Sequence, residues 1–199
     1  MIPVLEVAEP ASFDASVRRP GLNWLSNHNV PPSAKLPKGV KLQSYWRTTL
    51  GELHSSYDGI CAYLSIYIER CTGAVTADHF VAKSSSLALA YEWSNYRLAC
   101  TTLNARKNKF SLALDPFEIQ GETFHLELVS GRIFPNPLLD PVQNDRAQKT
   151  IALLKLDDGL CREARARRYS EYCSGDISAA FLQRYAPFVW FEADRQGLI

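Results

Sequence analysis

An acid, an imidazole, an amide and an amine occur together over residues 78–107, as Asp78, His79, Asn104 and Lys107. A carboxylate and an amide oxygen are hard ligands that suit Mg²⁺ or Mn²⁺, with water completing the shell. A neutral imidazole beside them can take a proton from an attacking water, and cationic side chains can neutralise phosphate oxygens. The four residues are therefore compatible with a site that binds a divalent metal ion and a phosphate group. An Asp-His pair also arises by chance, so a structural histidine stays open as the alternative.

These residues need a strand and a helix to bring them together, and the surrounding pattern predicts both. Residues 60–70 are rich in β-branched and aromatic side chains, and residues 73–80 start at a turn signal and then alternate, which together predict a hairpin. Residues 95–108 predict a helix with Asn104 on its polar face. The apolar positions of that helix recur at i, i+3, i+4 and i+7: Tyr96, Ala99, Cys100 and Leu103. Adjacent strand residues point to opposite faces, so the strand must end or bulge near residue 78 to aim both groups at one site.

The order of elements along the chain predicts an α+β protein. Prolines interrupt residues 1–42, which predicts a loop-rich arm, and residues 43–199 predict a single domain with the core of the site at about 60–110. The other predicted elements are a helix within 42–58, a hairpin within 122–134 with Ser130-Gly131 at its turn, and helices over 144–154, after Asp157 or Asp158, and over about 177–196. The tryptophans expected in the core are Trp46, Trp93 and Trp190.

Composition limits the partners and the setting. Lys and Arg number 22 and Asp and Glu 21, so any nucleic-acid contact needs a local basic patch rather than a global field. Five cysteines without regular spacing favour a reduced, intracellular protein. The N-terminal residues 1–13 carry acids and no basic region, so we expect no signal peptide. No apolar run approaches the roughly eighteen residues of a membrane helix, and a cytoplasmic location is expected.

The segment ADHFVAKS…AYEWSNYRLAC…N..K resembles the HNH endonuclease superfamily. The ββα-metal core of that superfamily carries an Asp-His pair on its second strand, an Asn in the connecting loop, and an Asn or His on the helix. The positions that look like these are Asp78-His79, Asn95 and Asn104. More narrowly, the segment is similar to a bacterial branch that includes HNH partners of anti-phage defence systems of the Septu type and some linked to retrons. The resemblance implies an HNH core within a mostly helical domain that has an additional β-hairpin.

The resemblance also implies roles for individual residues. His79 would be the general base, Asp78 and Asn104 would hold one divalent metal ion, Mg²⁺ or Mn²⁺, and Asn95 would fix the loop and orient the histidine. Lys107 would contact phosphate or stabilise the transition state. The basic residues that would contact nucleic acid are Lys83, Arg97, Arg106 and Lys109. The implied substrate is DNA, with RNA left open, and an ATPase is the implied partner protein.

Many members of this branch hold a structural zinc ion with two C-x-x-C pairs. The matching segments here are Cys61-Ala-Tyr-Leu64 and Cys100-Thr-Thr-Leu103, and each lacks its second cysteine. A closed zinc site needs four ligands, and buried thiols pack as small hydrophobic groups. We therefore expect no structural zinc, and an apolar cluster of these two cysteines and two leucines in its place.

A second function of a different class stays open. The near-zero net charge and the missing cysteines are also compatible with a non-catalytic subunit that binds nucleic acid or senses an ATPase partner. The intact set of Asp78, His79 and Asn104 favours the nuclease, because a protein that only binds has no need of all three.

Overall fold

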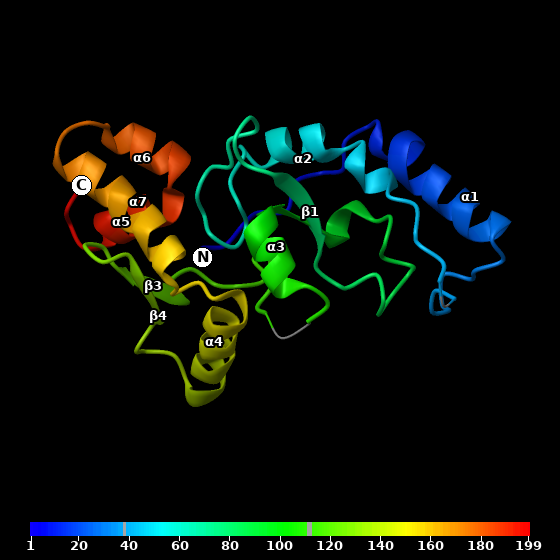
Figure 1. Cartoon of the computed structure of the whole chain (residues 1–199). Coiled ribbons are helices and arrows are strands. Elements are labelled where there is room, and N and C mark those ends of the chain that lie inside the picture. The colour runs from blue at the N-terminus through cyan, green and yellow to red at the C-terminus, as the bar shows by residue number, and fades with distance from the viewer. Residues whose placement is uncertain (38, 111–112) are drawn as a thin grey trace. The chain divides into compact units, whose positions relative to one another are not determined.

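The computed structural model describes residues 1–37, 39–110 and 113–199 (Figure 1). Lys38, one of the basic residues of the predicted N-terminal arm, lies outside the described residues. Within those ranges the protein is α+β, with helices and two separate two-stranded antiparallel sheets, which confirms the predicted class. No helix of the described ranges is long and apolar enough to cross a membrane.

The chain forms two compact units that alternate along the sequence. Unit 1 consists of Met1–Leu5, Ile60–Ile68 and Leu112–Ile199, and unit 2 consists of Glu6–Gly59 and Glu69–Ser111. The predicted division into an arm over 1–42 and a domain over 43–199 stays a prediction, although these compact units divide the chain at other places. Each unit is described by itself below.

The centre of unit 2 is a hairpin that runs directly into a helix. Strand β1 (Val75–His79) pairs antiparallel with strand β2 (Tyr96–Cys100), and helix α3 (Thr101–Lys107) begins at the next residue. In this register Asp78 lies opposite Arg97 and His79 opposite Tyr96. The loop of residues 80–95 that joins the two strands ends in the short 3₁₀ helix η3 (Trp93–Asn95). The end of β1 and the whole of α3 are thus brought close together in space (Figure 1).

The predicted helix over 95–108 is wrong in its first half, because residues 96–100 form β2. This strand is buried on both faces, so its sequence does not alternate between apolar and polar residues. Tyr96, Leu98 and Ala99 are all at most 1% exposed. A short apolar run of this kind cannot be assigned to strand or helix by periodicity alone. The i, i+3, i+4, i+7 spacing arose instead from a buried strand followed by two turns of helix.

The predicted partner of residues 73–80 is also wrong. These residues pair with β2 and not with residues 60–70, in which the only described pairing is an isolated bridge between Ile60 and Tyr67. Residues 60–68 belong to unit 1. A hairpin with residues 60–70 would close a shorter loop and lose less conformational entropy. Pairing with the almost fully buried β2 removes more apolar surface from water, and this gain outweighs the entropy of closing the longer loop.

The remaining elements of unit 2 are helical and short. The predicted loop-rich arm contains the π-helical turn η1 (Asp14–Arg18) and helix α1 (Arg19–Asn27), which is a correction. Pro20 does not prevent this helix, because the first turn of a helix has no hydrogen-bonded N–H to lose. The helix predicted within 42–58 is confirmed in part, as the 3₁₀ helix η2 (Tyr45–Arg47) and helix α2 (Leu50–Ser56).

Unit 1 combines the second hairpin with four helices. Strands β3 (Phe124–Glu127) and β4 (Arg132–Pro135) form the predicted hairpin. Its turn residue Gly131 has a φ of +70°, and a Cβ at this position would lie 2.1 Å from the carbonyl oxygen of Arg162. The helices are α4 (Pro141–Leu154), α5 (Gly159–Cys173), α6 (Ala179–Tyr185) and α7 (Pro187–Arg195).

The helices of unit 1 begin where the sequence places good N-caps. The Asp140 side chain accepts from Val142 N and Gln143 N, so α4 starts three residues before the predicted Asn144. Asp158 caps α5 as predicted, by accepting from Cys161 N. The predicted helix over 177–196 is two helices, because Pro187 disfavours the helical conformation of the residue before it.

Candidate functional site

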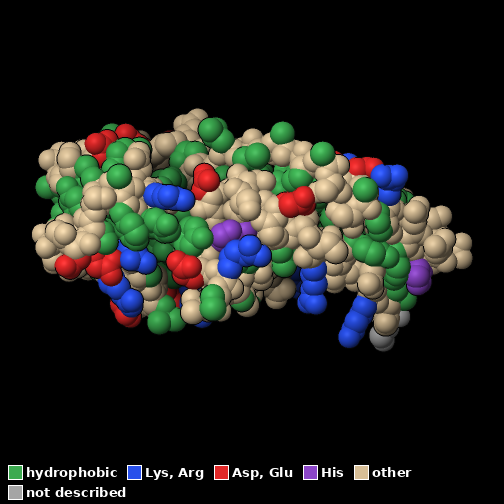
Figure 2. Space-filling view, turned by 90° about the horizontal axis from the view of Figure 1, so that it is seen from above, with side chains coloured by type: hydrophobic (Ala, Val, Ile, Leu, Met, Phe, Trp, Pro, Cys, Tyr) green, Lys and Arg blue, Asp and Glu red, His purple; other side chains and the backbone are tan. Residues whose placement is uncertain are grey.

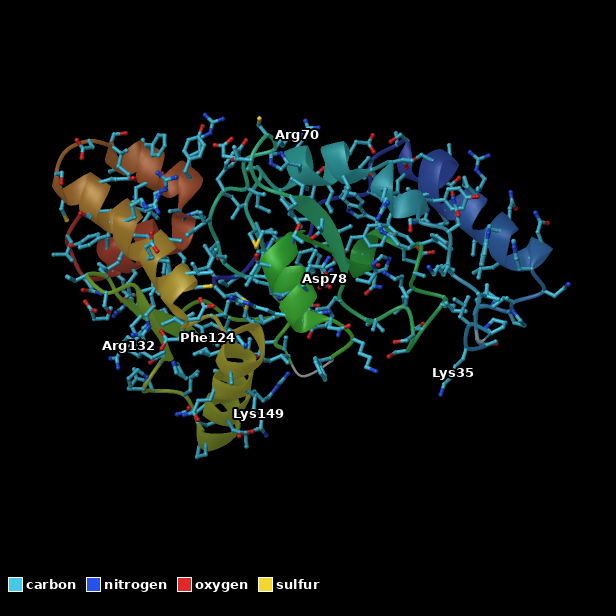
Figure 3. The ribbon with its side chains drawn as sticks, viewed as in Figure 1. Lys35, Arg70, Asp78, Phe124, Arg132 and Lys149 are labelled. Atoms are coloured by element: carbon cyan, nitrogen blue, oxygen red, sulfur yellow. The ribbon has the colours of Figure 1, made fainter. Side chains whose placement is uncertain are left out.

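A cavity of about 530 Å³ opens in unit 2 beside the end of β1, the loop after it and α3. Of the nine residues predicted for the site, five line this cavity: Asp78, His79, Lys83, Asn104 and Lys109. Figure 3 shows Asp78 at the side of α3. The sequence expected a strand that ends near residue 78, and β1 ends at His79, so that two adjacent side chains both reach the cavity.

Asp78 is held by a buried ion pair. Its carboxylate lies 3.1 Å and 3.3 Å from the Lys107 ammonium, and the two side chains are 2% and 0% exposed. The ammonium also donates to the carbonyl oxygens of His79 at 3.1 Å and Phe80 at 2.9 Å. A lysine has three N–H donors, and one carboxylate and two carbonyls accept from all of them. Lys107 therefore ties α3 to the end of β1.

This placement does not favour a direct contact of Lys107 with phosphate, and the role implied for Lys107 stays a prediction. Its ammonium is fully buried and is not part of the cavity lining. Arg97 is likewise turned inward, with its side chain donating to the carbonyl oxygens of Ser94 at 2.7 Å and Tyr96 at 3.1 Å. It is 4% exposed, so its position does not suit the predicted nucleic-acid contact. Arg106 is half-exposed on α3 and does not line the cavity.

The His79 ring is fixed by three neighbours. Its Nε2 lies 2.9 Å from the carbonyl oxygen of Ala90, which also accepts from the Tyr96 hydroxyl at 2.9 Å. The ring meets those of Tyr96 and Trp46 edge to face, at centroid distances of 4.9 Å and 4.7 Å. A carbonyl can only accept, so Nε2 carries the proton and Nδ1 is left as the acceptor.

The second ring nitrogen of His79 faces Lys83. The Lys83 ammonium lies 3.5 Å from Nδ1. Burial, helped by the charge of Lys83, lowers the pKa of His79 to about 3, and a smaller contribution from Lys107 acts in the same direction. Burial also lowers the pKa of Lys83 below its ordinary value. At neutral pH the imidazole is therefore uncharged, which is the form that can accept a proton from water.

The Asn95 side chain fixes the loop that contains Ala90, whose carbonyl oxygen accepts the hydrogen bond from His79. Its Oδ1 accepts from Val81 N at 2.8 Å, and its Nδ2 donates to the carbonyl oxygens of Val81 and Leu89 at 3.0 and 2.9 Å. Leu89 precedes Ala90, so these bonds hold both the start and the end of the loop against the strand ends. This geometry suits the loop-fixing role implied for Asn95, which acts on His79 through the backbone and not by contact.

Asp78 and Asn104, the two predicted metal ligands, both line the cavity and carry oxygens that a divalent cation could bind. In the described ranges no three His, Cys, Asp or Glu side chains are grouped as a metal site. One carboxylate and one amide fit an ion such as Mg²⁺, which keeps several waters and takes further oxygens from a phosphate. A carboxylate has about four acceptor sites on its two oxygens, so an aspartate can contact a lysine and a metal ion at once, and the residues present suit a weak site completed by substrate.

The four residues of the predicted apolar cluster fall in different units. Cys61 and Leu64 belong to unit 1, and Cys100 and Leu103 belong to unit 2. Cys61 and Leu103 are each 1% exposed, so each is buried within the structure. The cluster itself, and the absence of a structural zinc ion, stay predictions.

Two groups of the site were missed by the sequence. The carbonyl of Ala90 orients His79, and no side-chain pattern signals a backbone acceptor. Trp46 was expected in the core but is only half-buried, with its ring 4.4 Å from the Lys83 ammonium. The sequence did contain a signal that Trp46 is not fully buried. The Tyr45-Trp46 pair is flanked by Ser44 and the exposed Arg47, so neither side of the pair continues an apolar run.

Although the whole chain is close to neutral, its positive and negative charges are unequally divided between the two units. Unit 2 has 12 Lys and Arg residues against 8 Asp and Glu, a net charge of +4, and unit 1 has 10 against 13, a net charge of −3. The exposed basic side chains of unit 2 include Lys35, Lys41, Arg47, Arg70 and Lys109. Figure 2 shows Lys and Arg side chains projecting from the surface, and Figure 3 shows Lys35 pointing outward from its loop. The cavity therefore lies in the positive unit.

Comparison with known proteins gives this chain no family: no family model matches it, and no curated protein is similar to it in sequence.

Proposed function

We propose that the chain is a metal-dependent HNH endonuclease that hydrolyses phosphodiester bonds of DNA. One observation carries the proposal: β1, β2 and α3 form a hairpin that runs into a helix, and they deliver Asp78, His79 and Asn104 to a single cavity. The resemblance implies a similar combination of two strands, a helix and polar residues, although it places the Asp-His pair on the second strand, whereas here the pair lies at the end of the first strand of the hairpin. The proposal includes this core as the finer description of the α+β fold.

His79 is the general base of the proposed reaction. A water molecule in the cavity gives its proton to Nδ1, its oxygen forms a bond to phosphorus, and the bond from phosphorus to the leaving ester oxygen breaks. The leaving oxygen takes a proton from solvent. The bond from Nε2 to Ala90 keeps the ring in the tautomer that this step needs. A divalent ion held by Asp78 and Asn104 would supply positive charge for the phosphoryl oxygens.

The charge of unit 2 supports a nucleic acid as the substrate. A net charge of +4 on the unit that contains the cavity attracts a polyanion, and Lys83 and Lys109 stand at the cavity where a phosphate would enter. By the resemblance, the proposed setting is the bacterial cytoplasm, in an anti-phage defence complex with an ATPase.

The alternative is a non-catalytic subunit that binds nucleic acid or senses an ATPase partner. The buried ion pair favours it, because Lys107 already neutralises Asp78, the only carboxylate that the cavity lining contains among the described residues. His79 is also only 5% exposed. In this alternative the same cavity binds a phosphate without cutting it.

A cleavage assay separates the two functions. Purified protein is incubated with supercoiled plasmid and, in parallel, with a structured RNA, each with Mg²⁺, Mn²⁺ or EDTA. The nuclease predicts cleavage that needs the divalent ion and is lost in His79→Ala. His28→Ala is the matched control, because His28 is an exposed histidine of the same unit, bonded to a backbone carbonyl. Binding of plasmid without cleavage under every condition, with and without the ATPase partner, would favour the alternative.

A further inference from the structure

Three side chains from three separate segments meet at the Nδ1 edge of His79. Trp46 comes from η2, Lys83 from the loop after β1, and His79 from the end of β1. The Lys83 ammonium lies 4.4 Å from the centre of the Trp46 ring and 3.5 Å from His79 Nδ1. The Trp46 ring meets the His79 ring nearly at a right angle, at 83°. Each of the three therefore contacts the other two.

The contact between Lys83 and His79 has a defined direction. Nε2 carries the proton of the imidazole because it faces the Ala90 carbonyl, so Nδ1 offers a lone pair. The lysine ammonium has donors and no acceptor, so it points one of its N–H groups at that lone pair. In this arrangement the ammonium occupies the position from which a water molecule would have to give its proton to Nδ1.

The Trp46 ring explains why the ammonium stays there. A lysine side chain is long and flexible, and holding it in one place costs conformational entropy. The face of a tryptophan attracts a cation within about 6 Å of its centre, more strongly where water is excluded. Trp46 is itself packed against Tyr91, at a centroid distance of 6.1 Å, and so offers a fixed surface.

We propose that Trp46 is a positioning residue that holds the Lys83 ammonium against Nδ1 of His79 until a phosphate group of the substrate draws the ammonium away and frees the base. The inference rests on the proposed function for its catalytic part, whereas the three-residue cluster itself does not depend on it. A phosphate oxygen is a charged acceptor and forms a stronger hydrogen bond with an ammonium than a neutral imidazole does. When substrate binds, the Lys83 ammonium therefore replaces its hydrogen bond to His79 Nδ1 with a stronger one to a phosphate oxygen.

The proposal has a consequence for substrate-free protein. His79 Nδ1 is covered by Lys83 as long as no phosphate is present, so the base is exposed only beside the group that it acts on. Loss of the Trp46 ring should then loosen Lys83 and weaken the contact of its ammonium with the substrate phosphate.

The first test measures the reactivity of Lys83 and needs no catalytic activity. The protein is treated with an amine-acetylating reagent, and the rate at each lysine is measured by mass spectrometry, with the exposed Lys35 as internal standard. In Trp46→Leu we expect Lys83 to react about fivefold faster than in the wild type, as the loss of one cation–π contact allows. Trp46→Phe keeps an aromatic face and should stay within about twofold of the wild type.

Trp24→Leu is the matched control for this test. Trp24 also packs on a histidine of unit 2, with its ring 4.0 Å from that of His28. Its loss should leave the Lys83 rate unchanged. An equal Lys83 rate in the wild type and in Trp46→Leu would overturn the proposal, as would an equal increase in Trp24→Leu. Circular dichroism of each variant identifies a general loss of structure, and Trp46→Phe decides the question if Trp46→Leu does not fold.

The second test follows the exchange of partners. Acetylation is repeated in EDTA with a short DNA duplex as the probe, so that binding occurs without cleavage. We expect the duplex to slow the Lys83 reaction severalfold in the wild type and to slow it less in Trp46→Leu. A Lys83 rate that the duplex leaves unchanged would overturn the transfer of the ammonium to phosphate.

The third test is a kinetic double-mutant cycle on plasmid cleavage. Lys83→Met should raise KM about tenfold, because it removes the ammonium that binds the phosphate, Trp46→Leu should raise KM by less, and the double variant should lose no more kcat/KM than Lys83→Met alone. Lys83→Arg should recover part of the rate, because a guanidinium also stacks on an aromatic face. Additive losses would overturn the proposal. If the wild type cuts neither DNA nor RNA, the proposed function fails, and the acetylation rates still decide whether Trp46 holds Lys83.

Discussion

Each of the two units contains a cation that is at most 1% exposed, and the two cations are held in different ways. In unit 2 the Lys107 ammonium pairs with the Asp78 carboxylate and with two carbonyls. In unit 1 Arg165, which is 1% exposed, donates to the carbonyl oxygens of Gly131 and Leu156, and its Nη1 has no hydrogen-bond partner among the described residues. Burial lowers the pKa of Arg165 to about 10, so the guanidinium remains charged at neutral pH.

The difference indicates what each buried charge is for. Arg165 joins the turn of a hairpin to helix α5 through backbone atoms only, so it serves the packing of unit 1. Lys107 fixes a carboxylate at the wall of a cavity, and with it the distance from β1 to α3. Unit 1 has two helices of 14 and 15 residues, capped by Asp140 and Asp158, whereas the cavity of unit 2 is built from elements of five to seven residues.

The largest expected effect separates the buried histidines of the two units. His79→Ala should lower plasmid cleavage by about 10⁴-fold, because it removes the proposed base, whereas His125→Ala should leave the cleavage rate per folded molecule unchanged. His125 is 8% exposed in unit 1 and is therefore a matched control for burial. Initial rates are compared at equal concentrations of folded protein. Equal losses in the two variants would remove the functional distinction between the units.

The second prediction concerns the loss of the buried ion pair between Lys107 and Asp78 in unit 2. Lys107→Met should lower the free energy of unfolding by about 4 kcal/mol, because it leaves the Asp78 carboxylate buried without its partner. The double variant Lys107→Met, Asp78→Asn removes the stranded charge and should recover part of that loss. The free energies are measured by urea denaturation. A loss of less than about 1 kcal/mol in Lys107→Met would show that the pair is not buried in solution.

A third prediction concerns the close approach of backbone in unit 1. Gly131→Ala should destabilise the protein by about 3 kcal/mol, because the new Cβ meets the Arg162 carbonyl and φ is positive. Gly175→Ala is the control, because Gly175 also has a positive φ, of +78°, but a Cβ added there would meet no described atom within 4 Å. It should lower the free energy of unfolding by only about 1 kcal/mol. Thermal unfolding of both variants gives the comparison. Equal costs would mean that the backbone conformation alone, and not the contact with α5, requires the glycine.

The smallest expected effect is a pH dependence in the same hairpin. The Ser130 hydroxyl and the backbone N–H groups of Ser130 and Val129 donate to Glu127 and lower the pKa of its carboxyl group. A carboxyl whose pKa is lowered on folding stabilises the folded state above its unfolded pKa, and this contribution is lost as the pH falls through the folded pKa. Below about pH 4.5 the wild type should therefore lose stability more steeply than Glu127→Gln. Parallel urea titrations at several acid pH values measure the two slopes, and identical slopes would contradict the prediction.

Local sequence signals were sufficient where an element carries its own turn or cap residues. The β3–β4 hairpin with its Ser130-Gly131 turn and the start of α5 after Asp157 or Asp158 were predicted because turn and cap preferences act over a few residues. The α+β class followed from the same signals. The strand β2 was not predicted, because a strand buried on both faces has no period of two to detect.

For the site, the sequence by itself determined which chemical groups are present, and only the tertiary structure decided which of them face the cavity. Asp78, His79 and Asn104 were chosen for their chemistry and do line it. Lys107 and Arg97 are equally cationic, but both are turned inward, since buried carboxylate and carbonyl oxygens need donors that solvent cannot supply. The Ala90 carbonyl and the Trp46 ring reach His79 from distant segments, and such a contact follows from how the chain packs and not from the order of its residues.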